Sequence, residues 1–319
     1  DNGVYYPKPM NCPGHNLIFG ARQRSYRELP LRLFELGTVY RYEKSGTLHG
    51  LMRIRGFTQD DSHIYCTPEQ AHDEIRGLLG FVLSVLRAFG FTDFEASLST
   101  RPAKAETVGT DEGWAEATEN LRAALEAEGL AFEIDEGGGA FYGPKIDVKV
   151  RDAIGRHWQL STIQYDFNMA TRMGLEYVAA DGSRQTPIMI HRALFGSIER
   201  FFGVLIEHYA GAFPTWLAPV QVRVLPVRDD HAAYAAEVAA ELTALGVRVD
   251  VVDAAEKLGN RIRKAKGEKL PYVLVVGDDD VEARTVGVNP RGGEVERGVP
   301  VDAFAQRVVD EVDDQRHLR

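Results

Sequence analysis

The chain has 319 residues, of which 44% are apolar, and its formal net charge is −10 at pH 7. A single core rarely grows beyond roughly 250–300 residues, so this length predicts two domains, or one large domain with an appendage. The acidic balance excludes a protein that coats nucleic acid indiscriminately. No apolar run approaches the roughly 20 residues that cross a bilayer, so we expect a cytoplasmic protein with no membrane partner.

The first residues are predicted to be extended, because three prolines between Pro7 and Pro13 oppose a helix before Gly14. A helix is expected over residues 15–27. Because the chain starts abruptly in an apparent strand, we also expect further sequence upstream of Asp1.

Residues 39–66 are predicted to form an antiparallel hairpin, with strands over 39–43 and 52–60 and turn residues over 44–50. Alternate side chains of the return strand share one face; these are Arg53, Arg55, Phe57 and Gln59, with Asp61 and His63 continuing the alternation. Unpaired charges are costly to desolvate, so this cannot be an ordinary buried face. It either faces water or holds a charged ligand.

The capping box at residues 67–70 predicts a helix that ends at Gly90. Further strands are expected over 94–99, 131–135, 145–150, 157–167 and 187–190, with helices over 114–128 and 196–209. We therefore predict an α+β domain with a mostly antiparallel sheet over residues 1–215.

Strands and helices alternate in the rest of the chain. Strands are expected over 220–227, 247–252 and 271–276, and helices from 229 or 230 to 245, over 258–269 and over 301–312. This alternation predicts a smaller α/β domain with a mixed, mostly parallel sheet over residues 216–319.

Several segments carry a resemblance to a known family. Residues 41–43 (RYE) and 53–57 (RIRGF), with the loop between them, resemble the second motif of the class II aminoacyl-tRNA synthetases, and residues 196–201 (GSIERF) resemble the third. Within this class, three segments are similar to threonyl-tRNA synthetases: 9–15 (PMNCPGH), 57–63 (FTQDDSH) and 189–193 (MIHRA). The last hundred or so residues resemble the anticodon-binding domain of several members. The first class motif and the editing domains of many members are expected upstream of Asp1.

The resemblance implies one zinc ion per chain, held by Cys12, His63 and His191. Cys12 and Cys66 are the cysteines of the sequence and do not make a disulfide framework, so either could be a buried thiol or a metal ligand. The scattered spacing alone favours structural roles for the three residues. With zinc, they form a three-ligand site with an open position that would chelate the amino and hydroxyl groups of threonine.

Other substrate contacts also follow from the resemblance. Asp61 is expected to accept a hydrogen bond from the substrate hydroxyl, while Gln59, Tyr142 and Gln164 help to hold the amino acid. A turn-packing aromatic is an equally good interpretation of Tyr142. Valine lacks the hydroxyl and is rejected, whereas serine differs from threonine by one methyl group.

Activation requires a carboxylate to attack the α-phosphate of ATP, and guanidinium groups reduce the repulsion between these two anions. The resemblance implies that Arg41 bridges them and that Arg200 acts from the opposite side, so these two are the predicted catalytic residues. The remaining predicted ATP contacts are Arg53 on the outer phosphates, Phe57 stacked on adenine, Glu43 on its exocyclic amine, and Gln159 and Thr162. Mg²⁺ is expected with ATP.

In the C-terminal domain, a basic helix contains Arg261 and Lys264, and Arg291 lies in a turn. Local basic clusters can bind RNA phosphates even on an acidic protein, so these three are predicted to contact the anticodon. A solvated basic helix face is the simpler alternative.

The function implied by the resemblance is activation of L-threonine with ATP and its transfer to tRNA(Thr), by a protein whose full-length form is a homodimer. A prolyl enzyme of the same class is the nearest alternative. A catalytically silent paralogue that binds RNA or a partner protein is an alternative from another functional class.

Overall fold

The computed structural model describes residues 3–103 and 106–316. Its contacts divide the chain into two compact units, Asp1–Leu205 and Ile206–Arg319, hereafter the N-terminal and C-terminal units. This division lies inside α5 (Ile198–His208), whereas the sequence placed the boundary after residue 215. No helix among the described residues is long and apolar enough to span a membrane.

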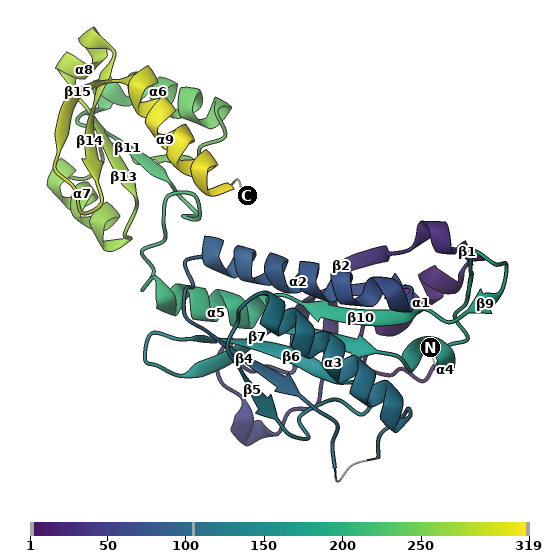
Figure 1. Ribbon diagram of the computed structural model, residues 1–319. Helices are drawn as coiled ribbons and strands as arrows, with labels where there is room; N and C mark the ends of the chain where they lie inside the picture. The colour runs from purple at the N-terminus through teal and green to yellow at the C-terminus, as the bar shows by residue number, and fades with distance from the viewer. Residues whose placement is uncertain (1–2, 104–105, 317–319) are drawn as a thin grey trace. The chain divides into compact units, whose positions relative to one another are not determined.

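A large sheet organises the N-terminal unit (Figure 1). Its strands are β2 (Leu31–Tyr40), β3 (Gly56–Cys66), β4 (Phe94–Ser99), β5 (Phe132–Asp135), β6 (Lys145–Arg151), β7 (His157–Asp166) and β10 (Ile188–Ala193). Within the described residues they pair in the order β2-β3-β10-β7-β6-β4-β5, and every pair except β4–β5 is antiparallel. The predicted mostly antiparallel sheet is confirmed.

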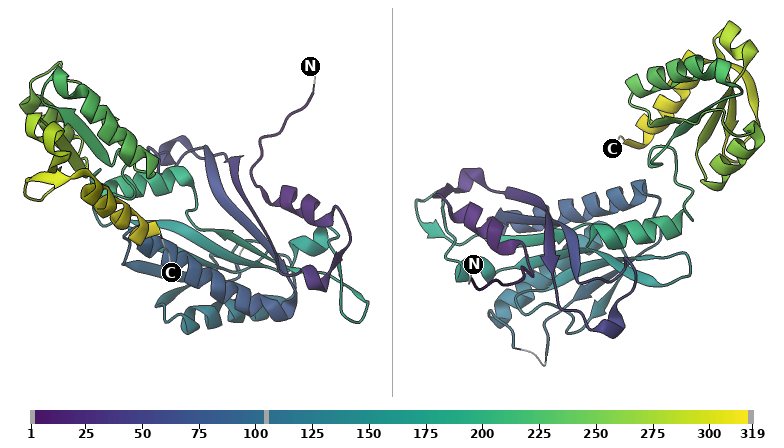
Figure 2. Two further views of the ribbon diagram at one scale, coloured as in Figure 1. Left: turned by 90° about the horizontal axis from the view of Figure 1, so that it is seen from above. Right: turned by 180° about the vertical axis from the view of Figure 1, so that it is seen from behind.

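Two helices, α2 (Pro68–Ala88) and α3 (Asp111–Ala127), lie side by side over one face of this sheet (Figures 1 and 2). The predicted capping box is present at the start of α2, where the Thr67 amide donates to Gln70 Oε1 at 3.0 Å. The apolar stripe of α2 is buried at Ile75, Leu79, Val82, Leu83 and Leu86, a spacing that aims one helix face at the core. The opposite face of the sheet is thereby left for a binding site.

The hairpin is confirmed, but its strands lie further from the turn than predicted. Val39 of β2 pairs with Phe57 of β3, and the ladder continues to Leu31 and Tyr65. Residues 41–55 form a loop that contains a short 3₁₀ turn, Ser45–Thr47, and a bridge between His49 and Arg53. Arg53 and Arg55 were predicted on the return strand, and this is wrong because the loop takes them out of the ladder.

The helix predicted over residues 15–27 is also misplaced, because α1 spans Cys12–Gly20. Pro13 lies in the first turn, where a helix tolerates a residue without an N–H group. Beyond α1, the strand β1 (Arg24–Ser25) pairs with β8 (Tyr177–Val178), and a 3₁₀ turn spans Tyr26–Glu28. The other small elements here are α4 (Met169–Arg172) and β9 (Arg184–Gln185), which pairs with β8.

The C-terminal unit contains a mixed sheet. Its strands are β11 (Val222–Pro226), β12 (Val249–Val251), β13 (Tyr272–Val276), β14 (Thr285–Pro290) and β15 (Glu296–Pro300). Among the described residues the order is β12-β11-β13-β14-β15, with β12, β11 and β13 parallel and the last two strands antiparallel. The mixed sheet is as predicted, but the sequence analysis missed β14 and β15.

The helices of this unit are α6 (Ala232–Ala244), α7 (Leu258–Gly267), α8 (Asp278–Ala283) and α9 (Val301–Arg316), with a 3₁₀ turn at Asp229–His231. A core forms where Val238 of α6 and Phe304 of α9 pack with Val224 and Leu274 of the sheet. The sequence analysis predicted these helices except α8, whose six residues are too short to show a helical period.

Candidate active site

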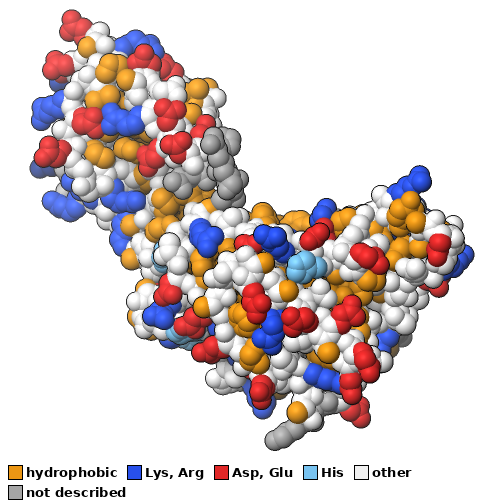
Figure 3. Space-filling view, in the orientation of Figure 1, with side chains coloured by type: hydrophobic (Ala, Val, Ile, Leu, Met, Phe, Trp, Pro, Cys, Tyr) orange, Lys and Arg blue, Asp and Glu red, His pale blue; other side chains and the backbone are white. Residues whose placement is uncertain are grey.

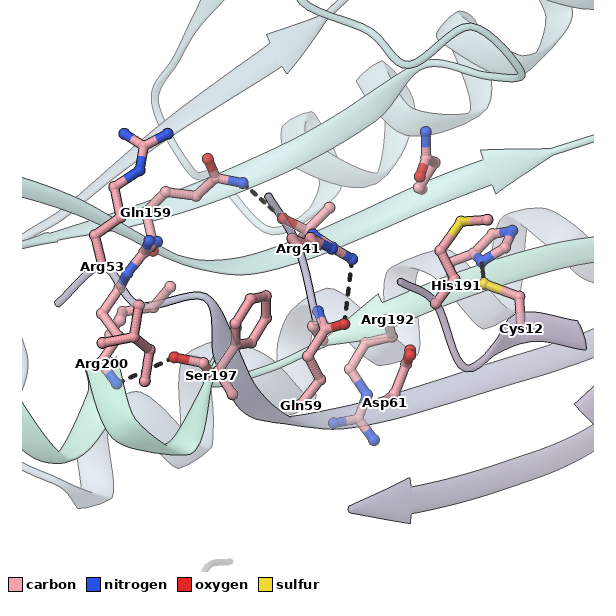
Figure 4. A pocket seen from close by; sticks show the side chains of 18 of the residues that line it. Cys12, Arg41, Arg53, Gln59, Asp61, Gln159, His191, Arg192, Ser197 and Arg200 are labelled. Carbon is pink, nitrogen blue, oxygen red and sulfur yellow. Dashed lines mark hydrogen bonds between the residues drawn. The ribbon is translucent and has the colours of Figure 1, made fainter. Parts of the chain in front are cut away.

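A cavity of about 350 Å³ opens on the N-terminal unit (Figure 4). Most of the predicted site residues line it, namely Cys12, Arg41, Glu43, Arg53, Phe57, Gln59, Asp61, Tyr142, Gln159, Thr162, Gln164, His191 and Arg200. His63 is fully buried beside it. Cys12 and His191 lie at one end of the cavity and Arg53 and Arg200 at the other, with Gln59 between them (Figure 4).

The strand register brings the residues of one end together. His191 on β10 pairs with His63 on β3 and with Gln164 on β7, so these three residues form a row across the sheet. On β3, Asp61 lies two positions before His63, and side chains two positions apart point to the same face. The predicted alternation is therefore correct from Phe57 onwards.

Cys12, His63 and His191 form a buried cluster whose ligand atoms all lie within 4.8 Å of one another. Cys12 comes from the first residue of α1, and its Sγ lies 3.6 Å from His191 Nδ1. The ring centroids of the two histidines lie 4.9 Å apart. One sulfur and two imidazoles are a donor set that zinc prefers.

Asp166 fixes the orientation of His191. Its Oδ2 lies 2.9 Å from His191 Nε2, which leaves Nδ1 facing Cys12. Burial opposes a charge on the ring, but the hydrogen bonds with Asp166 and Cys12 outweigh it and raise the pKa of His191 to about 10. A carboxylate behind a ligating imidazole is the usual support for a metal-binding histidine.

His63 has a different environment. Its Nδ1 lies 2.7 Å from His15 Nδ1, while its buried Nε2 has no hydrogen-bond partner among the described residues. Burial holds the pKa of His63 well below its usual range, and the neighbouring imidazole of His191 lowers it further. A neutral imidazole with an unsatisfied nitrogen beside a thiol fits a metal ligand, so the residues present fit zinc.

The polar groups next to this cluster are also held in place. Asn11 Nδ2 donates to Asp61 Oδ2 at 3.0 Å, and Asp61 Oδ1 lies 3.6 Å from His63 Nε2. Burial raises the pKa of Asp61, against the lowering effect of the hydrogen bond from Asn11. The Tyr142 ring lies 5.4 Å from the His191 ring, and burial raises the pKa of its hydroxyl. These groups can accept and donate hydrogen bonds to a small polar ligand.

Arginine and aromatic groups line the middle of the cavity and its other end (Figure 4). The Arg41 guanidinium lies 5.4 Å from the Phe57 ring centroid and donates to Gln59 Oε1 at 3.3 Å. Arg53 Nε donates to Glu43 Oε2 at 3.1 Å. This part of the cavity therefore offers positive charge and an aromatic face to an anion that carries a planar ring.

The side chain of Arg200 on α5 is held by two backbone carbonyl groups. It donates from Nε to Met52 O at 2.8 Å and from Nη1 to Gln159 O at 3.0 Å. Burial and the nearby charge of Arg53 lower the pKa of its guanidinium. Its position is thus fixed by the backbone before any ligand binds.

Comparison with known proteins identifies the family. The protein-family model described as the tRNA synthetase class II core domain (G, H, P, S and T) matches residues 1–209. The chain belongs to the class II aminoacyl-tRNA synthetases. A second family model, described as an anticodon binding domain, matches residues 221–311 of the chain. The two family models thus match separate parts of the chain, a core domain and an anticodon-binding domain.

Curated relatives of this chain include proteins named threonine–tRNA ligase. The Streptomyces coelicolor protein is 58% identical over 314 residues, which cover 98% of this chain and 48% of the relative. The Mycolicibacterium smegmatis protein is 58% identical over 305 residues, which cover 96% of this chain and 44% of the relative. The chain therefore spans about half the length of the curated relatives it matches.

Solved structures agree with the fold. One described as the RNA binding domain of threonyl-tRNA synthetase from Cryptosporidium parvum has a TM-score of 0.90 and 39% identity, and the match covers 95% of this chain and 76% of that one. A prolyl-tRNA synthetase from the same organism has a TM-score of 0.68 at 19% identity, covering 98% and 59%. The second likeness shows a shared fold alone.

The sequence analysis missed several residues of the candidate site. Asp147 Oδ1 accepts hydrogen bonds from Gln159 Nε2 at 2.6 Å and from Thr162 Oγ1 at 2.7 Å, so one buried carboxylate holds both predicted ATP contacts. Asp166 was missed as well. The sequence pattern of β6 and β7 did not mark these two aspartates as site residues. Their partners become clear only when the strands are paired in the sheet.

The C-terminal unit requires one correction. Arg261 was predicted to contact the anticodon, but its side chain is buried and donates to Glu256 O at 2.9 Å and Pro226 O at 2.8 Å. It stabilises the start of α7. Lys264 and Arg291 are exposed, and Figure 3 shows Lys and Arg side chains mixed with Asp and Glu on the face of this unit that it presents.

Proposed function

We propose that this chain carries the catalytic and anticodon-binding parts of a threonyl-tRNA synthetase, which activates L-threonine with ATP and transfers it to tRNA(Thr). The observation that carries the proposal is the Cys12, His63 and His191 cluster at one end of the cavity. The names of the curated relatives support the same substrate.

Cys12, His63 and His191 would hold one zinc ion. When bound there, zinc would act as a Lewis acid that attracts the amino and hydroxyl groups of the substrate. Asp61 would accept the hydroxyl proton in a hydrogen bond, while Gln59, Tyr142 and Gln164 hold the rest of the amino acid. A site built around a hydroxyl rejects valine far better than an apolar pocket would.

Arg41 would bridge the threonine carboxylate and the α-phosphate, because it lies between the metal cluster and the arginine end. Arg200 would contact the same phosphate from the opposite side and Arg53 the outer phosphates, which Mg²⁺ accompanies. Phe57 would stack on adenine, with Glu43 accepting from its exocyclic amine. Gln159 and Thr162, held by Asp147, complete the proposed ATP contacts.

The remaining proposals concern partners. Lys264 and Arg291 would contact the anticodon of tRNA(Thr), and the full-length protein would act as a cytoplasmic homodimer. A catalytically silent paralogue that binds RNA or protein is disfavoured, because the arginines and the buried polar cluster needed for chemistry all meet in one cavity.

Calorimetric titration with stable aminoacyl-adenylate mimics tests this function. The zinc-loaded chain is expected to bind threonyl-sulfamoyl-adenosine and to bind the prolyl analogue at least a hundredfold more weakly. Equal affinity for the two analogues, or preference for the prolyl one, would overturn the assignment. Tight binding without any adenylate formation from threonine and ATP would favour the silent paralogue.

A further inference from the structure

We propose that His15 and Glu35 form a relay that positions His63 for zinc, an inference that rests on the proposed metal site. His15 and Glu35 are positioning residues here, since neither is among the three clustered ligands and neither lines the cavity. Each acts on the metal through His63.

The three side chains form a chain of contacts that leads away from the cluster. His63 Nδ1 lies 2.7 Å from His15 Nδ1, and His15 Nε2 lies 3.5 Å from Glu35 Oε1. The two rings meet edge to face, with their centroids 4.8 Å apart. Side-chain exposure increases from 0% for His63 to 6% for His15 and 35% for Glu35. The carboxylate thus stands where water can solvate it.

Hydrogen-bond chemistry then fixes where the protons lie. If His63 binds a metal through Nε2, its proton must be on Nδ1, and that N–H has His15 Nδ1 as its acceptor. His15 Nδ1 then carries a lone pair, so the His15 proton is on Nε2 and faces Glu35. The His63–His15 hydrogen bond then has one donor and one acceptor, the His15 Nε2 proton faces the Glu35 carboxylate, and both imidazoles stay neutral.

Local structure explains how these residues meet. Cys12 and His15 are three positions apart in α1, and residues at this spacing share one helix face. The first turn of α1 therefore supplies both a proposed ligand and the support for another. Glu35 is brought close because it pairs with Asp61 in the β2–β3 ladder, two positions before His63.

The two proposed imidazole ligands are supported differently. A buried carboxylate, Asp166, holds His191 directly at 2.9 Å. No acidic side chain among the described residues is hydrogen bonded to His63 Nδ1, and His15 takes that place. Loss of His15 should therefore free the His63 ring to rotate and to exchange its tautomer.

The test measures zinc affinity by competition with a chromogenic chelator, together with the visible spectrum of the cobalt-substituted chain. His15→Leu, which removes the acceptor, is expected to weaken zinc binding 10–100-fold, the usual effect of losing such support, and to change the cobalt spectrum. His15→Asn places an amide oxygen near the position of Nδ1 and should keep most of the affinity. Glu35→Gln should give a smaller loss than His15→Leu.

A matched control exists in the same unit. His157 Nδ1 lies 2.6 Å from Glu95 Oε2, so this pair has the same chemistry but does not line the cavity. His157→Leu should leave zinc affinity unchanged. Circular dichroism confirms that each variant is folded before it is compared.

The outcomes separate the relay from the metal site itself. A wild-type chain that binds zinc tightly, with His15→Leu binding it equally well, would overturn the relay and leave the proposed function standing. Equal losses in His15→Leu and His15→Asn would also overturn it, because packing rather than the acceptor would then matter. A folded wild-type chain that binds no zinc would overturn both proposals.

Discussion

Cys12 Sγ lies 3.6 Å from His191 Nδ1, although 179 residues separate the two positions in the chain. The fold closes this distance by placing the first turn of α1 beside β10, which lies between β3 and β7 in the sheet. His63 reaches the same point from β3, which pairs directly with β10. The candidate metal site therefore depends on the tertiary structure of the N-terminal unit and on no short sequence motif.

Removal of the Cys12 thiolate should abolish stoichiometric zinc binding. Cys12→Ala leaves two imidazoles, which are too few to hold zinc tightly, so elemental analysis of the purified variant should find well below one zinc per chain. Cys66→Ala is the matched control, because Cys66 is equally buried but lies outside the cluster. A Cys66 variant that loses zinc while Cys12→Ala retains it would contradict the site.

Glycine at position 37 is expected to be important for substrate recognition. A Cβ atom on Gly37 would lie 2.5 Å from the Asn11 amide, which holds Asp61. Gly37→Ala should therefore displace Asn11 and raise the KM for threonine roughly tenfold, about the worth of one hydrogen bond to a charged group, with a smaller effect on the KM for ATP. Gly46→Ala, with no heavy atom within 4 Å of the new Cβ, should behave as wild type.

Arg200 should act on the rate of adenylate formation. Arg200→Lys keeps the charge but loses the planar fork that Met52 O and Gln159 O hold, so single-turnover formation of the adenylate should slow by roughly 10²–10³-fold. Arg55→Lys is the control, because Arg55 lies in the same loop as Arg53 without lining the cavity. Equal rates for Arg200→Lys and wild type would remove Arg200 from the mechanism.

The sequence correctly predicted the site residues that alternate along a single strand. Alternation along β3 correctly grouped Phe57, Gln59, Asp61 and His63, because a strand repeats every two residues whatever surrounds it. Arg53 could not be placed in this way, since its loop conformation depends on a bridge to His49.

Local sequence patterns could not predict the residues whose roles depend on tertiary contacts. Asp166, Asp147 and Glu35 look like ordinary strand carboxylates until their partners across the sheet are known. Arg261 looked like an exposed basic residue because its helix is rich in Lys and Arg. Its guanidinium is instead satisfied by carbonyl groups of distant segments, including Pro226 O.

Asp152 should make stability depend on pH in the acid range. Burial favours its neutral form, but hydrogen bonds from Trp158, Arg156 and two backbone amides outweigh it and lower the pKa of Asp152 from 3.8 to about 2. Its stabilising effect is therefore complete above about pH 4 and is lost as the pH falls through about 2.

Urea unfolding of Asp152→Asn tests this dependence. The variant should be less stable than wild type by about 1–3 kcal/mol at pH 7, because the hydrogen bonds to a buried carboxylate are weakened. The difference in unfolding free energy should shrink between about pH 4 and pH 2. A difference that stays constant over this range would show that the Asp152 carboxylate does not titrate as described.

The most direct test of the central claim is amino-acid-dependent ATP–pyrophosphate exchange by the zinc-loaded protein, measured with threonine, serine, valine and proline. Threonine should support rapid exchange, and serine should support slower but measurable exchange, because one methyl group is worth only about 1–3 kcal/mol. Valine and proline should remain at background, because neither offers a hydroxyl to the Cys12, His63 and His191 end of the cavity. Exchange driven by proline, or by valine as well as by threonine, would contradict the account.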